Sequence, residues 1–326
     1  MLTHDLGNGN FLRVTGQVVA WVREDYNFYQ INADDVYAQI GKKGVWDVMA
    51  GRFLTWRVFR KGLGFDLYTL EDTGARTKPN FADQSGWYSH MYEVNTIFMR
   101  DSFGSTPVPA GRVALHYYPS SCSGIELVGS YGRLQSGGNV AGGRIAAGIQ
   151  QKYFNALGGA EYEHWAPPQQ IGGPDPATGS FIACEKCGVA NAYGAGGSAA
   201  LTLNPVEFVL DAAYRKFDSW NGQVTSVLTS SKTTSFGGYL QFDAGSVVIQ
   251  RSLIVGGGLF RTEFLDNDKL FQRHWQAAGY IAYPLGFNNA VVKLVLSKAT
   301  GYQTHRDDPV LDSDMYSLRL RFAFYY

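Results

Sequence analysis

Apolar and polar residues alternate with a period of two through most of the 326-residue chain. This period places successive side chains on opposite faces of an extended strand, so each segment has one apolar and one polar face. The segment 316–326, YSLRLRFAFYY, shows the pattern clearly. No segment of useful length has the apolar spacing of a helix, with a cap at its start and Gly at its end. The pattern therefore predicts an all-β protein.

The connections between these segments fall into two length classes. The short connections are 41–44, 119–124, 150–155, 204–207, 243–246 and 284–289. The long connections are 24–33, 132–143, 166–190, 217–231, 261–271 and 300–313. From Gly111 onward the two classes alternate, as do the short periplasmic turns and long extracellular loops of outer-membrane barrels. We therefore predict one domain, residues 1–326, folded as a transmembrane antiparallel β-barrel.

The direction in which each segment runs predicts how many strands the barrel has. Eleven strands follow from Gly111 to the C-terminus, and 11–23, 34–41 and 45–56 form three more. An even number of strands must then fit between residues 56 and 111, and we place two there, at 62–70 and 92–100. The predicted total is about 16 strands, with 14 as the fallback, because the alternation is least regular after residue 59.

Composition agrees with a barrel and excludes some partners. Aromatic residues make up 14% of the chain and Gly occurs 39 times, which is typical of β proteins. The 28 basic and 28 acidic residues balance, so no nucleic acid is expected as a partner. No stretch approaches the ~20 apolar residues of a membrane helix, but a transmembrane strand needs only about 9–11 alternating residues. Residues 1–14 do not resemble a secretory leader, so we expect a mature chain with an added Met1.

If the apolar face meets lipid, the opposite face lines a lumen. The charged residues of that face are our pore-lining candidates, namely Arg13, Glu126, Arg144, Glu161, Glu163, Glu207, Arg215, Lys293, Arg319 and Arg321. We expect Arg319 and Arg321 to lie beside Lys293 and, once the barrel closes, beside Arg13 on the first strand. A ladder of cations favours anions in a narrow pore. Pairing with lumen carboxylates is the alternative, and the overall neutrality of the chain favours it.

The segment 52–65, RFLTWRVFRKGLGF, holds four cations among aromatic residues. These constriction candidates are Arg52, Arg57, Arg60 and Lys61. One interpretation is a constriction or a loop folded into the lumen. The other is the top of a strand with an aromatic girdle and solvated charges. The sequence leaves both open.

The cysteines predict one crosslink. Cys184 and Cys187 form a C-x-x-C motif in the longest loop, 166–190, which contains no His or further Cys. Such a motif occurs in redox pairs and in zinc sites, but a zinc site would need two more ligands, so no metal is expected. We favour a local disulfide on the outer surface. Cys122 lies in a short turn at the opposite rim, so we expect it not to pair with them.

Catalytic signatures are missing from the sequence. The six histidines are scattered singly, and no G-x-S-x-G motif accompanies them. A phosphate loop and a dinucleotide fingerprint are also missing. We therefore expect neither an enzyme nor a cofactor.

Several segments together resemble a known family. HYYPSS at 116–121 followed by GIELVGSYG at 124–132, GAEYEH at 159–164 before a long loop, and an aromatic last strand are similar to Gram-negative outer-membrane porins. The nearest likeness is to the 16-stranded general or phosphate-selective porins, and it covers the whole chain.

The resemblance implies a location in the outer membrane, with contact to lipid and lipopolysaccharide. It also implies trimeric assembly and an inward-folded constriction loop. The residues that match the signal for the outer-membrane assembly machinery are Leu320, Phe322, Phe324 and Tyr326, although many of these porins end on Phe.

We therefore predict a porin that lets small hydrophilic solutes and ions diffuse through a water-filled barrel. The alternative is a non-transporting barrel that scaffolds or anchors a partner in an envelope complex. A lumen plugged by residues 57–89 or by another protein would mark that alternative. A barrel enzyme is a third class.

Overall fold

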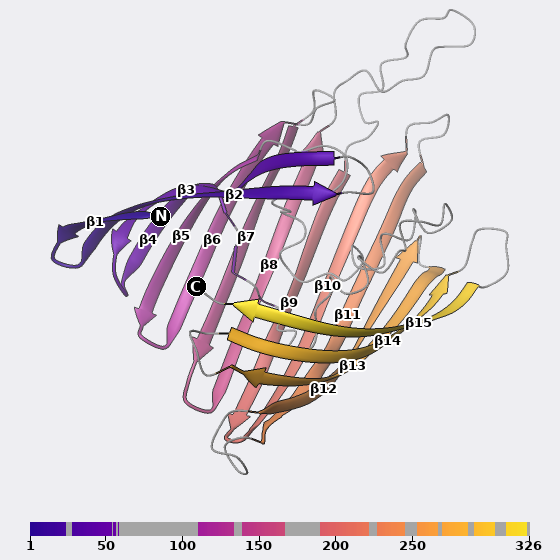
Figure 1. Ribbon diagram of the computed structural model, residues 1–326. Coiled ribbons are helices and arrows are strands. Elements are labelled where there is room, and N and C mark those ends of the chain that lie inside the picture. The colour runs from indigo at the N-terminus through magenta and orange to yellow at the C-terminus, as the bar shows by residue number, and fades with distance from the viewer. Residues whose placement is uncertain are drawn as a thin grey trace, which may run out of the picture.

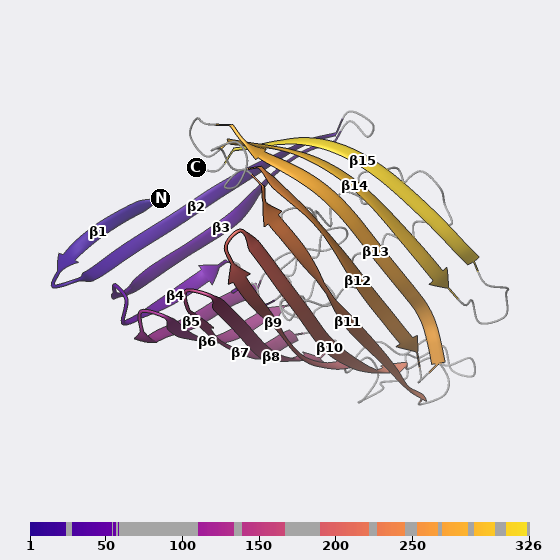
Figure 2. The same ribbon diagram turned by 90° about the horizontal axis from the view of Figure 1, so that it is seen from below.

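The computed structural model describes residues 1–23, 28–53, 55, 56, 58, 110–133, 139–166, 190–221, 227–244, 253–266, 269–285, 290–303 and 311–324. These residues form one 15-stranded sheet in which every strand pairs antiparallel with its neighbours in the chain. Figures 1 and 2 show that the sheet is strongly curved, with β1 and β15 at its two ends. Within these ranges no helix is long and apolar enough to cross a membrane.

The strands have the following bounds. They are β1 (Leu2–Gly7), β2 (Asn10–Arg23), β3 (Phe28–Lys42), β4 (Trp46–Arg52), β5 (Ala110–Ser120), β6 (Ser123–Arg133), β7 (Asn139–Gln150), β8 (Phe154–Ala166), β9 (Ala190–Leu203), β10 (Val206–Asn221), β11 (Val227–Asp243), β12 (Ile254–Asp266), β13 (Lys269–Pro284), β14 (Ala290–Gln303) and β15 (Leu311–Phe324).

Most of the predicted strands are confirmed. The eleven strands predicted after Gly111 are β5 to β15, and the three predicted near the N-terminus are β2, β3 and β4. The strands predicted at 62–70 and 92–100 lie outside the described residues. The described strands number 15, one more than the fallback of 14, and the total of about 16 stays a prediction.

The structure adds one strand that the alternation did not predict. β1 pairs with the first part of β2 through a two-residue turn at Asn8 and Gly9. These residues have φ angles of 52° and 80°, the conformation that Asn-Gly turns adopt in tight hairpins. The sequence Gly7-Asn8-Gly9 carried this hairpin signal, but β1 is too short and too exposed to show a clear apolar face.

Five long connections were predicted too long. β3 begins at Phe28, β7 at Asn139 and β13 already at Lys269, while β10 continues to Asn221 and β14 to Gln303. The predicted limits of 24–33, 132–143, 217–231, 261–271 and 300–313 are therefore wrong. Near the ends of β10 and β12 the positions that continue the apolar face hold charged residues such as Lys216 and Arg261. The backbone ladder continues there although the alternation of hydrophobicity stops.

The two faces of the sheet have an inverted burial pattern. On β6, Leu127 is 43% exposed, whereas its neighbour Glu126 is 1% exposed. The same inversion holds on β14, where Leu294 and Leu296 are exposed and Lys293 is buried. We call the exposed apolar face outward and the face of the buried charges inward. A sheet of a water-soluble protein packs its apolar face on the core, so this pattern is that of a barrel with an apolar exterior.

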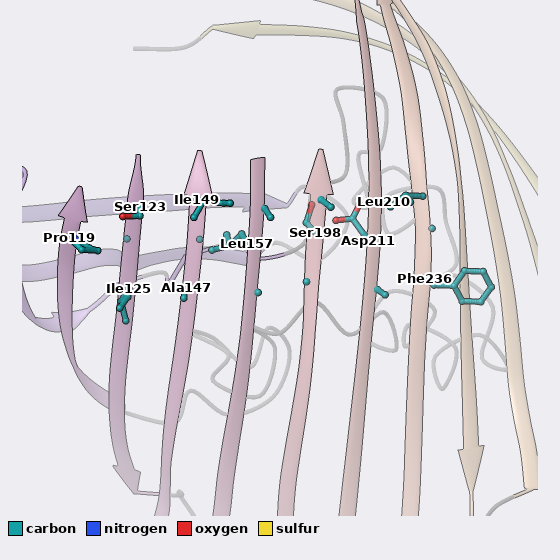
Figure 3. Close-up of a pocket in the computed structure, with 18 residues that line it drawn as sticks. Pro119, Ser123, Ile125, Ala147, Ile149, Leu157, Ser198, Leu210, Asp211 and Phe236 are labelled. Atoms are coloured by element: carbon teal, nitrogen blue, oxygen red, sulfur yellow. The ribbon is translucent and has the colours of Figure 1, made fainter. Parts of the chain in front are cut away.

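The outward face contains a shallow hollow of about 840 Å³ across β5 to β11 (Figure 3). Small residues on adjacent strands form its floor, including Ala147, Ala156 and Ala199. Larger side chains flank the floor, among them Ile149 and Phe236. Because most of its lining residues belong to the apolar outward face, this hollow is not part of an inner passage.

The outward face generates a test with two matched substitutions. Leu210 and Leu203 are both 54% exposed, but Leu210 lies within β10 and Leu203 ends β9 at the short turn. We expect Leu210→Arg to lower the free energy of unfolding by about 2–4 kcal/mol and Leu203→Arg by about 0–1 kcal/mol, because the penalty for a charge depends on depth in the bilayer. Urea titration in lipid vesicles measures both, and equal effects would contradict this orientation.

Candidate functional site

The predicted pore-lining residues with described side chains all lie on the inward face. Glu126, Arg144, Glu161, Glu163 and Lys293 are buried. Arg13, Glu207 and Arg215 have the same inward parity and are half-buried. The inward face of the sheet is therefore the candidate functional site.

The predicted neighbours of the last strand are confirmed in part. Arg321 on β15 pairs in the ladder with Lys293 on β14, as expected, and Arg319 pairs with Val295. The expected contact with Arg13 is wrong, because β1 pairs with β2 there and Arg13 lies opposite Thr3. The guanidinium of Arg13 instead donates a hydrogen bond to Gln39 on β3, at 3.4 Å.

Five neighbouring strands build an ion-pair cluster on this face. Asp47 on β4, His116 on β5 and Glu126 on β6 are successive partners in one row of the ladder. His116 Nδ1 lies 2.7 Å from Asp47 Oδ1, and its Nε2 lies 3.2 Å from Glu126 Oε2. On β7, Arg144 donates from Nη1 to Glu126 Oε1, and its Nε lies 3.9 Å from Glu161 Oε2 on β8. The inward-facing Arg144 is thus paired with carboxylates.

The cluster binds the chain that follows β4. The backbone N–H of Trp56 donates to both carboxylate oxygens of Glu126, at 3.2 and 3.0 Å. Arg144 Nη2 donates to the carbonyl of Trp56, and Arg112 Nη1 donates to the carbonyl of Phe53 at 2.8 Å. Three charged side chains, those of Glu126, Arg144 and Arg112, therefore replace the ladder bonds that this backbone would make in a strand.

Side-chain packing reinforces these hydrogen bonds. The indole of Trp56 stacks on the His116 imidazole, with ring centroids 5.2 Å apart and planes 6° from parallel. A Cβ added at Gly124 would lie 2.8 Å from the indole ring, so this glycine gives the ring its space. Phe53 and Val58 are fully buried. We call residues 53, 55, 56 and 58 the inner segment.

The inner segment decides between the two interpretations of the region 52–65. The chain leaves the sheet at Arg52, the last residue of β4, so the predicted strand 45–56 is too long. The inner segment then lies against the inward face of β5 to β7. The described part of this region is therefore folded inward. Among the constriction candidates, Arg52 is half-buried, and Arg57, Arg60 and Lys61 lie outside the described residues.

A second polar chain crosses the inward face of β10 to β13. Gln241 on β11 donates from Nε2 to Glu207 on β10. The hydroxyl of Tyr280 on β13 donates to Gln241 Oε1 at 2.8 Å. Glu207 is thus another inward-facing carboxylate that bonds to a neighbouring side chain.

The inward face also carries apolar residues. Val58 of the inner segment belongs to a buried cluster whose other members are Ala146, Ala192, Ala213, Phe260, Ala278, Tyr280 and Val295. Trp56 packs against the same cluster. The interior is therefore not lined by polar side chains alone.

Sequence reasoning missed the role of three residues in this site. Asp47, Trp56 and His116 were not among the pore-lining or constriction candidates. The signal was available for two of them, since Asp47 and His116 share the inward parity and occupy neighbouring strands. Trp56 could not be found in this way, because its position depends on a segment that leaves the ladder.

The remaining predicted residues have mixed outcomes. Leu320 and Phe322 point outward and are each 60% exposed, and Phe324 ends β15. Tyr326, Cys184 and Cys187 lie outside the described residues. Cys122 is exposed and is a free cysteine in the part of the chain that is described.

The charged side chains of the cluster bind the backbone of the inner segment. Each ring nitrogen of His116 already faces a carboxylate. In the described ranges, no group of three or more His, Cys, Asp or Glu side chains is arranged to hold a metal ion. The arrangement therefore fixes the inner segment and leaves paired charges along the wall.

The up-and-down antiparallel sheet, with its apolar exterior, charged interior and inward-folded segment, has the fold of outer-membrane β-barrels. Solved structures of that class share the fold. The outer membrane channel DcaP of Acinetobacter baumannii is similar with a TM-score of 0.56 and 10% identity, over 98% of this chain and 82% of that chain. OmpT, an outer membrane protein of Vibrio cholerae, is similar with a TM-score of 0.54 and 10% identity, over 98% and 84% of the two chains.

These likenesses establish the fold and no more, because the sequences are only 10% identical. No protein-family model matches the chain, and no curated protein matches it either.

The ion-pair cluster generates a double-mutant test. Glu126→Leu leaves the buried Arg144 guanidinium and the Trp56 N–H without their acceptor, so we expect about 3–5 kcal/mol less unfolding free energy. Adding Arg144→Met should recover part of this loss, because the uncompensated buried charge is then removed. Urea titration in detergent or vesicles measures the free energy of unfolding of each variant in this double-mutant cycle.

The matched control is Lys43→Met. Lys43 pairs with Asp5 at 3.7 Å, but both side chains are 64% exposed, so we expect no measurable change. If Glu126→Leu behaved like this control, the cluster would not hold the segment.

Proposed function

We propose that the protein is an outer-membrane porin through which small hydrophilic solutes and ions diffuse passively. The observation that carries this proposal is the inverted burial of the sheet, with exposed aliphatic residues outside and buried charges inside. Such a distribution suits a barrel in lipid around an aqueous interior. A barrel of about 16 strands would also be too wide for side chains alone to fill. The likeness to an outer membrane channel supports the same conclusion.

We infer that ion selectivity is weak. Arg144 shares its charge with Glu126 and Glu161, and His116 lies between two carboxylates. An ion filter uses a ring of unpaired charges that all have one sign, and paired charges along a wall do not form such a ring. The positions of Arg319 and Arg321 beside Lys293 and Val295 make them the residues to test for any anion preference.

The inner segment is the proposed constriction. It lies inside the curved sheet, where it occupies space that solutes would otherwise use. The Glu126 and Arg144 side chains fix its backbone from two neighbouring strands. A passage narrowed in this way would limit solutes by size more than by charge.

The proposed location is the outer membrane of a Gram-negative bacterium, with lipid around the outward face. We propose that the aromatic end of β15 serves as the assembly signal, and that the protein is not an enzyme. A homotrimer is also proposed, since one of the similar solved structures is described as a trimer form of the Vibrio cholerae OmpT.

A second candidate function is a non-transporting barrel that anchors a partner in an envelope complex. The apolar cluster on the inward face favours it, because Phe260, Tyr280 and Val295 would suit a filled interior better than a wet one. The inner segment contributes Val58 to this cluster.

Planar-bilayer recording separates the two functions. The purified, folded barrel is expected to give stable open current steps, with a reversal potential close to zero in a salt gradient because its wall charges are paired. Current silence from well-folded protein would contradict the porin and support the anchoring barrel. Arg319→Ala with Arg321→Ala should reduce any residual anion preference.

The same recording tests the constriction. We expect the Glu126→Leu, Arg144→Met double variant to conduct more than the parent, because the inner segment loses the hydrogen bonds that hold Trp56. Glu207→Gln is the control, since it removes a carboxylate from the inward face away from this segment. Equal conductance in the double variant and the parent would show that the segment does not limit the current.

A further inference from the structure

The end of β4 is the point at which the chain leaves the sheet. β4 has 7 residues, whereas the next two strands, β5 and β6, have 11 each. The ladder between β4 and β5 ends at the pair Gly51–Arg112, and the ladder between β3 and β4 ends at Val36–Arg52. The feature that ends β4 here therefore decides that the following residues enter the interior.

Gly51 has a backbone conformation that favours glycine. Its φ angle is 137°, in the positive range that residues with an L side chain rarely adopt. A Cβ at this position would collide with the carbonyl oxygen of Val36 and would lie 2.7 Å from Tyr37 Cα. A regular strand residue of this parity would point its Cβ into the interior, so the pleat of β4 is already broken at Gly51.

The residues after Gly51 run back toward the short-turn rim. Arg112 on β5 donates to the carbonyl of Phe53, and Trp56 stacks on His116, four positions farther along the same strand. Those four positions span about 13 Å of β5, which ends at a short turn. Since β4 runs away from the short-turn rim and the inner segment runs toward it, the chain reverses direction between Gly51 and Phe53.

Buried side chains stabilise this reversal. Phe53 is 1% exposed, and its ring meets that of Tyr37 edge to face, with centroids 5.9 Å apart. Phe53 also packs against Ala114 on β5 and Val128 on β6. The first residues of the inner segment are therefore held by packing as well as by hydrogen bonds.

We propose that Gly51 is the positioning residue of the inner segment, because its backbone conformation turns the chain from β4 into the interior. The proposal rests on the proposed function only where it states that this segment narrows the passage. An L side chain at position 51 would favour a negative φ, so β4 would continue along β3. The residues that follow would then remain in the ladder, and the passage would be wider.

Thiol accessibility reports the position of the inner segment without any current. Thr55 is 5% exposed. A Thr55→Cys thiol, in a background whose native cysteines are changed to serine, should therefore react slowly with a water-soluble maleimide in the detergent-solubilised barrel. We expect Gly51→Ala to raise this rate about tenfold, because strain at one backbone position can shift an equilibrium by that factor. An unchanged rate would overturn the proposal.

Gly44→Ala is the matched control. Gly44 lies in the turn before β4 with a φ angle of 70°, but a Cβ there would meet nothing within 4 Å. The substitution therefore introduces strain at a positive φ without disturbing the exit from β4. We expect a lower free energy of unfolding, with the thiol reaction and the conductance of the parent. An equally fast thiol reaction in this control would show that general destabilisation exposes Thr55, and it would overturn the proposal.

A D-alanine at position 51 is the conservative rescue. A D residue adopts a positive φ readily, because its allowed conformations are the mirror images of those of an L residue. Inserted by semisynthesis, it should restore the slow thiol reaction of the parent. A fast reaction with both alanines would contradict a role for the backbone conformation.

Planar-bilayer recording separates this proposal from the proposed function. Gly51→Ala should conduct more than the parent, and adding Glu126→Leu with Arg144→Met should give no further increase, because all three substitutions release the same segment. A silent parent in which Gly51→Ala still accelerates the thiol reaction would contradict the porin and support the role of Gly51. A conducting parent in which Gly51→Ala changes neither current nor thiol reaction would support the porin and refute the role of Gly51.

Discussion

Every backbone amide of a strand that crosses hydrocarbon must be hydrogen-bonded within the protein, because lipid offers no partner. The described strands β2 to β14 meet this demand by pairing antiparallel with a neighbour on each side, and β1 and β15 each pair with one neighbour. Because the backbone hydrogen bonds lie within the sheet, each side chain can point only outward or inward. Alternation then follows: aliphatic residues such as Leu294 must face outward, and charged ones such as Lys293 must face inward. The cluster around Glu126 depends on this division.

The same demand explains how the inner segment is held. Once the chain leaves β4 at Arg52, its backbone has no neighbouring strand, so the amide and carbonyl of Trp56 need other partners. Glu126 and Arg144 supply them, and they also neutralise each other. A charged pair in the wall therefore does two things: it satisfies a segment that crosses the interior, and it lowers the net charge of the passage.

Strands in which apolar and polar residues alternate regularly were predicted well from the sequence. Strands in which this alternation is interrupted were missed or predicted too short. The eleven strands after Gly111 and the pairing of Arg321 with Lys293 follow from parity alone. The upper parts of β10 and β12 were missed because cations stand on their outward face. β1 was missed because it is a short edge strand, and its place beside Arg13 removed the predicted contact with the last strand. The position of Trp56 depends on tertiary contacts, which no periodicity encodes.

The central claim is that one face of the sheet meets lipid and the other meets water. Single cysteines placed along β10 test it directly, in a background whose native cysteines are changed to serine. At Phe208 and Leu210 a fluorescent label should be quenched by brominated lipid, whereas at the half-buried Glu207 and Arg215 the thiol should react with a water-soluble methanethiosulfonate and change the pore current. The same response at all four positions, or the reverse alternation, would contradict the account.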